Sequence, residues 1–240
     1  MLSKLVIIPT LNEVDNIEKL IKELFSLNLD FSVLVVDDES TDGTQKAVER
    51  LTADFSDLFL LKRKGKKGLG KAYVDGFKWA LKKNFDYIFQ MDADFSHNPQ
   101  DLEKLFLACH KFNYDVAIGS RYVKGVNVVN WPMKRVLLSW FASKYVKLVT
   151  GMPIDDATAG FICYKRAVLE DLNIDKIKFV GYAFQIEMKY KIYLHNFKIK
   201  EVPVIFTDRE KGKSKMSAKI INEGILGVLK LRLNKLKFKK

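Results

Sequence analysis

Two carboxylates end one of the most apolar runs of the chain. Tyr-Ile-Phe-Gln-Met, residues 87–91, is followed by Asp92 and Asp94. A carboxylate at the edge of a buried strand is costly unless a cation or hydrogen-bond donors meet it. Because the two acids occupy alternate positions, both side chains can face one side and share a hard divalent cation. The competing interpretation, that they cap a helix beginning near Pro99, is weaker because the pair directly ends an apolar strand.

A second pair of acids follows another apolar run in "VVDDESTDGT". Asp37 and Asp38 end the expected strand, and Thr41 or Asp42 can cap the next helix, with Gly43 easing the turn. Capping accounts only for the second half of this motif. Adjacent acids at a strand end suit hydrogen bonds to ribose hydroxyls or to a base edge, so we expect a nucleoside here.

Two basic, glycine-containing loops are candidates for binding phosphate. The first, "GKKGLGKA", satisfies G-x-x-x-x-G-K with Lys71, but Ala72 stands where a P-loop needs a hydroxyl for magnesium, which excludes that ATPase motif. What remains is a loop that opens a helix and can approach phosphate or sugar closely. The second, "REKGKSK" with Arg209 and Lys215, is either an ordinary solvated loop or a clamp that closes over a diphosphate.

Short apolar runs alternate with helix-period segments through the first half of the chain. The expected helices span 16–27, 44–51, 70–82 and 99–112, and later ones span 131–149 and 183–194. Strands this apolar, separated by helices, predict an α/β fold with a mostly parallel central sheet covered on both faces. The polar residues at the strand ends then converge on one rim, where ligands of such sheets bind. We expect one domain over 1–240, since no linker or repeat interrupts the chain.

The composition suits a globular protein at a membrane surface. No run of about 18 apolar residues could cross a bilayer, and two well-separated cysteines, Cys109 and Cys163, suit reduced thiols in the cytoplasm. Residues 209–240 carry nine of the twelve net positive charges. Within them, 217–240 reads as a basic amphipathic helix that either packs on the domain or lies on an anionic membrane. Its Leu/Ile-rich face lacks the aromatic stacking residues that nucleic-acid binding would need, so we expect no nucleic acid partner.

Taken together, these motifs resemble the family 2 glycosyltransferases of GT-A fold, and within them the dolichol-phosphate (polyprenol-phosphate) mannose synthases. The resemblance spans nearly the whole chain, through "IPTLNE", "VVDDESTDGT", "GLGKAYVDGF", "MDADFSHNP", "IGSRYVKG", "WPMKRVLLSWFAS", "DDATAGFICYKR", "GYAFQIEM" and "REKGKSK". It implies an inverting enzyme that moves mannose from GDP-mannose to a polyprenyl (dolichyl) phosphate. UDP-sugar donors, other lipid or sugar acceptors and a non-catalytic nucleotide-sugar or nucleic-acid binding module are the alternatives.

The resemblance also assigns residues. The nucleotide sugar would be held by Pro9, Glu13, Asp37, Asp38, Lys71, Gln185, Glu187, Arg209 and Lys215, the last two in a mobile loop over 208–216. Asp92 and Asp94 would bind Mg²⁺ or Mn²⁺, and Arg121, Arg135 and Ser139 would meet the acceptor phosphate. Ser96 stands where many members carry Gln, so a third metal ligand would be this hydroxyl or a water. The transmembrane helices that some members append are absent, which implies membrane contact through the terminal helix or an anchoring partner subunit.

Overall fold

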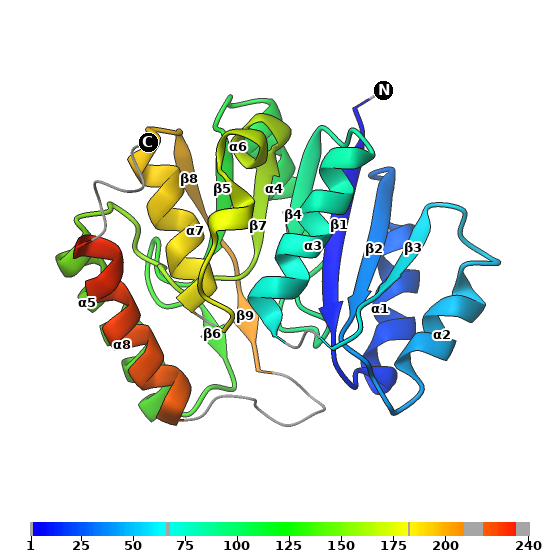
Figure 1. Cartoon of the computed structure of the whole chain (residues 1–240), viewed down its shortest axis with the longest axis horizontal. Helices are drawn as coiled ribbons and strands as arrows, with labels where there is room; N and C mark the ends of the chain where they lie inside the picture. The colour runs from blue at the N-terminus through cyan, green and yellow to red at the C-terminus, as the bar shows by residue number, and fades with distance from the viewer. Residues whose placement is uncertain (1, 66–67, 182, 209–217, 234–240) are drawn as a thin grey trace.

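A seven-stranded sheet with the order β3-β2-β1-β4-β7-β5-β8 forms the centre of the protein (Figure 1). The computed structural model describes residues 2–65, 68–181, 183–208 and 218–233. The strands are β1 (Lys4–Thr10), β2 (Phe31–Asp37), β3 (Leu58–Lys62), β4 (Tyr87–Gln90), β5 (Val116–Ser120), β7 (Ile162–Lys165) and β8 (Ile199–Pro203). All neighbouring strands pair in parallel except at β7, so the predicted mostly parallel α/β sheet is confirmed.

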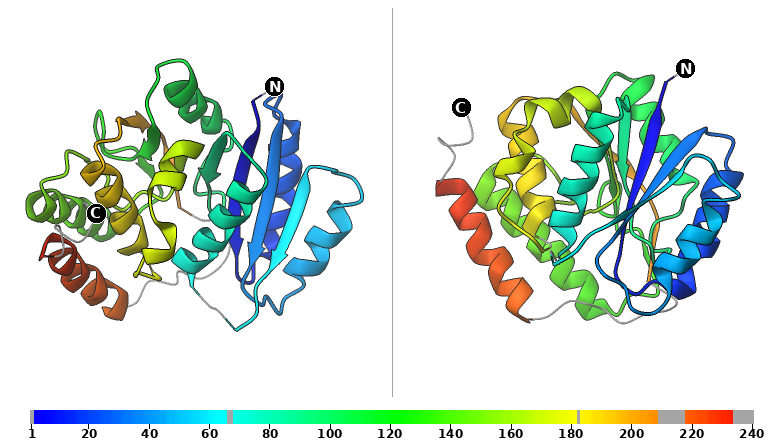
Figure 2. Two further views of the ribbon diagram at one scale, coloured as in Figure 1. Left: turned by 45° about the horizontal axis from the view of Figure 1, so that its top comes forward. Right: turned by 45° about the vertical axis from the view of Figure 1, so that its right-hand side comes forward.

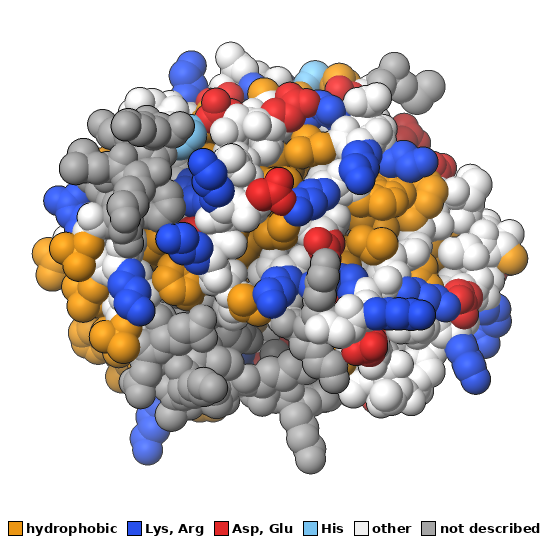
Figure 3. Space-filling model, viewed as in Figure 1, with side chains coloured by type: hydrophobic (Ala, Val, Ile, Leu, Met, Phe, Trp, Pro, Cys, Tyr) orange, Lys and Arg blue, Asp and Glu red, His pale blue; other side chains and the backbone are white. Residues whose placement is uncertain are grey.

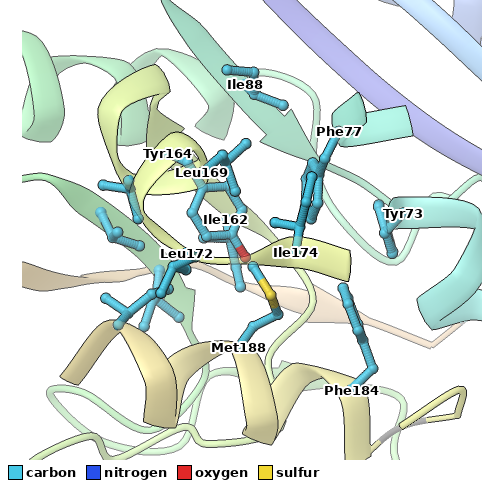
Figure 4. Close-up of a cluster of buried hydrophobic side chains, with 14 of the residues drawn as sticks. Tyr73, Phe77, Ile88, Ile162, Tyr164, Leu169, Leu172, Ile174, Phe184 and Met188 are labelled. Atoms are coloured by element: carbon cyan, nitrogen blue, oxygen red, sulfur yellow. The ribbon is translucent and has the colours of Figure 1, made fainter. Parts of the chain in front are cut away.

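Helices cover both faces of this sheet, because β1 is apolar on both sides. Val6 and Ile8 share one buried cluster with residues of α1, α2 and α4. Leu5 and Ile7 share the other with residues of α3 and α7, and Figure 4 shows the ring of Phe77 on α3 beside Tyr164 on β7. The helices are α1 (Val14–Ser26), α2 (Thr44–Leu51), α3 (Leu69–Lys82), α4 (Asp101–His110), α5 (Met133–Thr150), α6 (Arg166–Asp171), α7 (Ala183–Leu194) and α8 (Ala218–Leu233), with a 3₁₀ turn at Ile174–Lys176.

Within the central sheet, β7 is a strand that the sequence pattern did not predict. It lies between β4 and β5 and runs antiparallel to both, pairing Ile162 with Gln90 on one side and Ile118 on the other. An antiparallel strand begins where its parallel neighbours end. The turn that leads into β7, residues 155–161, therefore lies at the same rim as the carboxyl ends of β4 and β5.

A smaller layer lies at one edge of the sheet. The short strands β6 (Val128–Val129) and β9 (Phe206–Thr207) pair in parallel, and α5 and α8 lie side by side (Figure 2). The Tyr145 hydroxyl of α5 donates to the Ile225 carbonyl of α8 at 3.1 Å. Among the described residues, no helix combines the length and apolar character needed to cross a bilayer.

Candidate active site

One cavity of about 420 Å³ runs from the ends of β4 and β5 to the space between α5 and α8. Its inner end is polar and its outer end is apolar. The polar lining includes Asp92, Asp94, His97, Arg121, Arg135, Ser139 and Gln185. The apolar lining includes Leu138, Phe141, Ala142, Tyr145, Ile225 and Val228. The cavity can therefore hold a molecule that is charged at one end and hydrocarbon at the other.

Asp92 and Asp94 lie together at the polar end, and neither caps a helix. The N-cap of α4 is Gln100, and its N–H donates to Asn98 Oδ1 at 3.0 Å, so the interpretation of Asp92 and Asp94 as helix caps is wrong. Ser96 donates to Asp94 Oδ1 through its hydroxyl at 2.6 Å and through its N–H at 3.2 Å. The Tyr73 hydroxyl donates to Asp92 Oδ1 at 3.4 Å. Burial, together with Asp92, raises the pKa of Tyr73 well above its usual value, so the phenol keeps its proton.

The surroundings of these carboxylates fit a divalent cation. Carboxylate oxygens are the donors that Mg²⁺ and Mn²⁺ prefer. A Cβ at Gly160 would lie 3.9 Å from Asp92 Oδ2 and 3.4 Å from Gln185 Nε2, so glycine leaves room beside the carboxylate. Gln185 Oε1 is buried and has no hydrogen-bond partner within the described part of the chain. In that same part, no three His, Cys, Asp or Glu residues gather as a metal site.

His97 supports this loop as a neutral imidazole. It accepts a hydrogen bond from the Asp92 N–H at Nδ1, at 3.2 Å. Its ring stacks on Phe161 with centroids 4.8 Å apart. Burial lowers the pKa of His97 to about 4, against the opposing effect of Asp94. The ring is therefore uncharged at neutral pH, and its Nδ1 already serves to hold the Asp92 backbone.

Arg121 faces the cavity from the end of β5, and Asp156 fixes its orientation. Its Nε donates to Asp156 Oδ2 at 2.7 Å and its Nη2 to Asp156 Oδ1 at 2.5 Å. Nη2 also donates to the Thr158 hydroxyl at 2.8 Å. Burial alone would raise the pKa of Asp156, but the Arg121 charge and hydrogen bonds outweigh it and the pKa is lowered. The turn that leads into β7 thus supplies this arginine with a partner that is ionised at neutral pH.

Arg135 lies in the first turn of α5 and lines the same cavity as Asp92 and Asp94. Its guanidinium stacks over Trp131 at 3.9 Å from the ring centroid. Its Nη1 donates to Asp208 Oδ1 at 2.6 Å. Ser139 lines the cavity one helical turn further along α5. The structure therefore brings together the three residues predicted to meet an acceptor phosphate, Arg121, Arg135 and Ser139.

Asp37 and Asp38 do not line this cavity. Asp37 is fully buried and accepts from four donors: the Thr10 and Ser40 hydroxyls, the Ser40 N–H and the Gln45 amide. Asp38 pairs with Arg63 and accepts from the Gly68 N–H at 2.9 Å. In this structure both acids hold the turn after β2, and their contact with a nucleoside stays a prediction.

Glu187 also lies away from the cavity, whereas Gln185 lines it. The Glu187 carboxylate is buried and accepts from the N–H groups of Lys178 and Phe179 at 2.9 and 3.0 Å. That segment in turn packs on the glycine-rich loop, since the Val180 carbonyl accepts from the Gly70 N–H at 2.7 Å. Glu187 therefore supports the loop that precedes Lys71 and does not touch the cavity.

The remaining predicted residues are dispersed. Lys71 is exposed in the first turn of α3, Pro9 pairs with Val36 at the end of β1, and the Glu13 N–H donates to Thr44 just before α1. None of these three lines the cavity. Arg209, Lys215 and the rest of 209–217 lie outside the described residues, as does 234–240.

Sequence reasoning missed three side chains that shape the polar end: His97, Asp156 and Asp208. His97 gives no signal in the sequence, because the three histidines of the chain are too scattered for a zinc site. Asp156 belongs to the quoted "DDATAGF" stretch, but only the antiparallel β7 brings it to the rim. Asp208 is the first residue of the loop predicted over 208–216, and no spacing rule connects it with Arg135, 73 positions earlier.

The fold and the cavity define a class of protein. The structure superposes on glucosyl-3-phosphoglycerate synthase from Mycobacterium tuberculosis, solved with Mn²⁺, UDP-glucose and phosphoglyceric acid. The TM-score is 0.66 with 15% identity, over 99% of this chain and 79% of that one. A second structure of that enzyme, with Mg²⁺ and UDP, gives 0.64 and 18%, over 96% and 79%. These matches establish the GT-A glycosyltransferase fold.

The sequence comparisons then give the family. Residues 5–172 match the model of glycosyl transferase family 2, and the chain belongs to that family. It is 39% identical over 224 residues to an undecaprenyl-phosphate mannosyltransferase of Micrococcus luteus, covering 93% of this chain and 91% of that protein. It is 41% identical over 225 residues to a polyprenol monophosphomannose synthase of Mycolicibacterium smegmatis, covering 93% and 84%. The protein is a glycosyltransferase.

Proposed function

We propose that the protein transfers mannose from GDP-mannose to a polyprenyl monophosphate, with inversion at the sugar carbon and with Mg²⁺ or Mn²⁺ as cofactor. One observation carries the proposal: a single cavity joins the Asp92 and Asp94 carboxylates, two arginines and an apolar passage between α5 and α8. A lipid phosphate matches this cavity, because its charged phosphate suits the arginines and its hydrocarbon chain suits the apolar passage. The names of the two bacterial relatives point to the same acceptor class and sugar.

The chain's own residues can orient the acceptor without a catalytic base. Arg121 and Arg135 are charged donors that suit the oxygens of a phosphate monoester. A monoester with a second pKa of about 6 is already mainly ionised at pH 7 and needs no deprotonation. His97 is neutral and its Nδ1 is engaged by the Asp92 N–H, so it is not required as a base.

Asp92 and Asp94 are the residues that would hold the metal. When bound, a divalent cation there supplies charge neutralisation for the leaving diphosphate. The polar end carries the carboxylates of Asp92, Asp94 and Asp208 against the guanidinium groups of Arg121 and Arg135. Among the described residues, this end has no excess positive charge for a diphosphate and a phosphate together without a cation, which supports a requirement for metal.

A UDP-sugar is the second donor candidate. The fold neighbours were solved with UDP-glucose or UDP, and the residues around the cavity do not discriminate between bases. In that case the acceptor and the displacement geometry stay the same, and only the donor changes.

The face around the apolar end supports contact with a membrane. Exposed hydrophobic side chains gather over α5 and α8 at the left edge of Figure 3. They include Met133, Leu137, Phe141, Leu148, Ile225, Leu226, Leu229 and Leu233. An apolar patch of this kind marks a protein or membrane contact, and the cavity opens within it. Both cysteines are free thiols, which suits the cytoplasmic face of that membrane.

Liposome flotation tests this surface. Phe141→Glu should reduce the fraction of protein floating with anionic vesicles, because it places a charge in the patch. Phe112→Glu is the matched control, since Phe112 is 64% exposed after α4 and Phe141 is 60% exposed on α5. Equal loss in both variants, or loss in neither, would contradict the assignment of this face.

Transfer itself is tested with a short polyprenyl phosphate, Mg²⁺ or Mn²⁺, and labelled GDP-mannose, UDP-glucose or UDP-N-acetylglucosamine. The expected result is organic-extractable label from GDP-mannose, abolished by EDTA. Label from a UDP-sugar instead would keep the acceptor and replace the donor. No label from any donor, with and without membranes that supply an anchoring subunit, would overturn the proposed function.

A further inference from the structure

The short strand β9 connects the two sides of the polar cavity. On one side, the Thr207 N–H donates to the Ser96 carbonyl at 3.3 Å, and Phe206 forms a β-bridge with His97. On the other side, β9 pairs with β6 through Val128 and Val129. Since Ser96 and His97 belong to the loop that carries Asp92 and Asp94, β9 is fixed directly against that loop.

Asp208 follows β9 and reaches Arg135. Its N–H donates to the Val129 carbonyl at 3.0 Å, which holds its backbone on β6. Its carboxylate accepts from Arg135 Nη1 at 2.6 Å. Trp131 lies under the guanidinium at 3.9 Å and packs edge-on against Phe206 at 5.2 Å. Arg135 is thus held on its face by a ring and at one nitrogen by a carboxylate, both anchored on β9.

We propose that Asp208 is a positioning residue that sets Arg135 at a fixed place relative to Asp92 and Asp94. This inference rests on the proposed function and deepens it. A guanidinium carries five N–H groups, so pairing at Nη1 leaves donors for a phosphate oxygen. Displacement requires the attacking oxygen to lie in line with the leaving group, and small misplacements are costly in rate. The short strand β9 contacts both the loop that carries Asp92 and Asp94, on the side of the leaving group, and the residues that hold Arg135, on the side of the attacking phosphate.

The pair is partly exposed, with side-chain exposures of 31% for Arg135 and 27% for Asp208. A surface pair of this kind contributes little to stability. Removing the Asp208 charge should therefore leave the fold intact while Arg135 samples other rotamers. A loss of turnover without a loss of thermal stability is the signature that separates positioning from a structural role.

The test compares Asp208→Asn, Asp208→Glu and Asp155→Asn in the full chain. Asp155 is the matched control, because it pairs with Lys147 of the same helix α5 at 2.8 Å but does not line the cavity. Rates are measured against polyprenyl phosphate with the donor found active for the wild type. The readouts are kcat, KM for each substrate, and melting temperature.

The expected result for Asp208→Asn is a fall in kcat of about tenfold to a hundredfold, with donor KM and melting temperature unchanged. Asp208→Glu should recover most of the kcat, since it restores the carboxylate, and Asp155→Asn should equal the wild type. An Asp208→Asn enzyme with wild-type kcat, or a Glu variant as slow as the Asn variant, would overturn the inference. An inactive wild type would instead overturn the proposed function, and this inference with it.

Discussion

Two strand ends of this protein look alike in sequence and differ in what they do. Asp37 ends β2 and is followed by Ser40, while Asp94 follows β4 and is followed by Ser96. In both cases the serine donates to the carboxylate through its hydroxyl at 2.6 Å and through its N–H. Asp37 has further donors and is fully buried, whereas Asp94 lines a cavity.

The difference comes from the neighbours of each acid. Thr10 and Gln45 complete the set of donors around Asp37, and Arg63 neutralises the adjacent Asp38. Asp92 and Asp94 instead line the cavity, and Gly160 carries no side chain that would fill the volume beside Asp92. A carboxylate supplied with donors stabilises a turn, while one facing an open space can bind an external cation. The following predictions test that distinction.

Asp92→Ala should have the largest effect, on activity alone. It removes a proposed metal ligand, so we expect transfer to fall by about a thousandfold, or about 4 kcal/mol, with little change in melting temperature. Steady-state rates across a metal titration measure the loss. Asp175→Ala is the control, an exposed acid paired with Lys78. An active Asp92→Ala enzyme would contradict the metal assignment.

Arg63→Met should have the largest effect on stability. The Arg63 side chain is 3% exposed and pairs with Asp38 and Asp75, so the substitution leaves the buried Asp38 charge without its partner. We expect a loss of about 3 to 5 kcal/mol in the free energy of unfolding. Urea denaturation measures it, with Arg50→Met as the exposed control. A variant as stable as the wild type would show that Asp38 is not held by this pair.

Asp37→Asn should destabilise the turn after β2 by a smaller amount. In the variant, the amide NH₂ group takes the place of a carboxylate oxygen that accepts from a hydroxyl or an N–H, so two donors face each other. We expect the free energy of unfolding to fall by about 2 to 3 kcal/mol. The same urea experiment with Asp54→Asn, an exposed acid, provides the reference. If stability holds while nucleotide affinity falls, Asp37 serves the nucleoside as the family resemblance implies.

The two serines give the finest comparison. Ser96→Ala should weaken the apparent affinity for metal by about threefold to tenfold, since it removes one support of Asp94, and should leave stability nearly unchanged. Ser40→Ala should cost about 1 kcal/mol of stability and leave metal affinity unchanged. Metal-dependent rates and urea curves for both variants measure this. If both variants changed metal affinity and stability in the same way, the proposed difference between the ends of β2 and β4 would be contradicted.

Much of the fold was predictable because local patterns are strong in its first half. The predicted helix over 44–51 is α2, and that over 183–194 is α7. β7 was not predicted, because a four-residue apolar strand gives no sign of its direction. At the site, the pairing of Asp92 with Asp94 followed from their spacing. Gln185 lines the cavity and Glu187 does not, since on a helix buried on nearly all sides no pattern says which way a side chain points. Contact of Glu187 with the nucleotide sugar stays a prediction.

The sequence by itself determined the α/β class, the glycosyltransferase family and the acids at two strand ends, because these depend on residues close together in the chain. Only the tertiary structure decided which acids face a cavity. That outcome depends on distant partners: Arg63 for Asp38, Gly160 beside Asp92, Asp156 for Arg121 and Asp208 for Arg135. A buried carboxylate binds the cation or hydrogen-bond donor that the fold places next to it. The separation of two residues along the sequence does not say how far apart they lie in the folded protein.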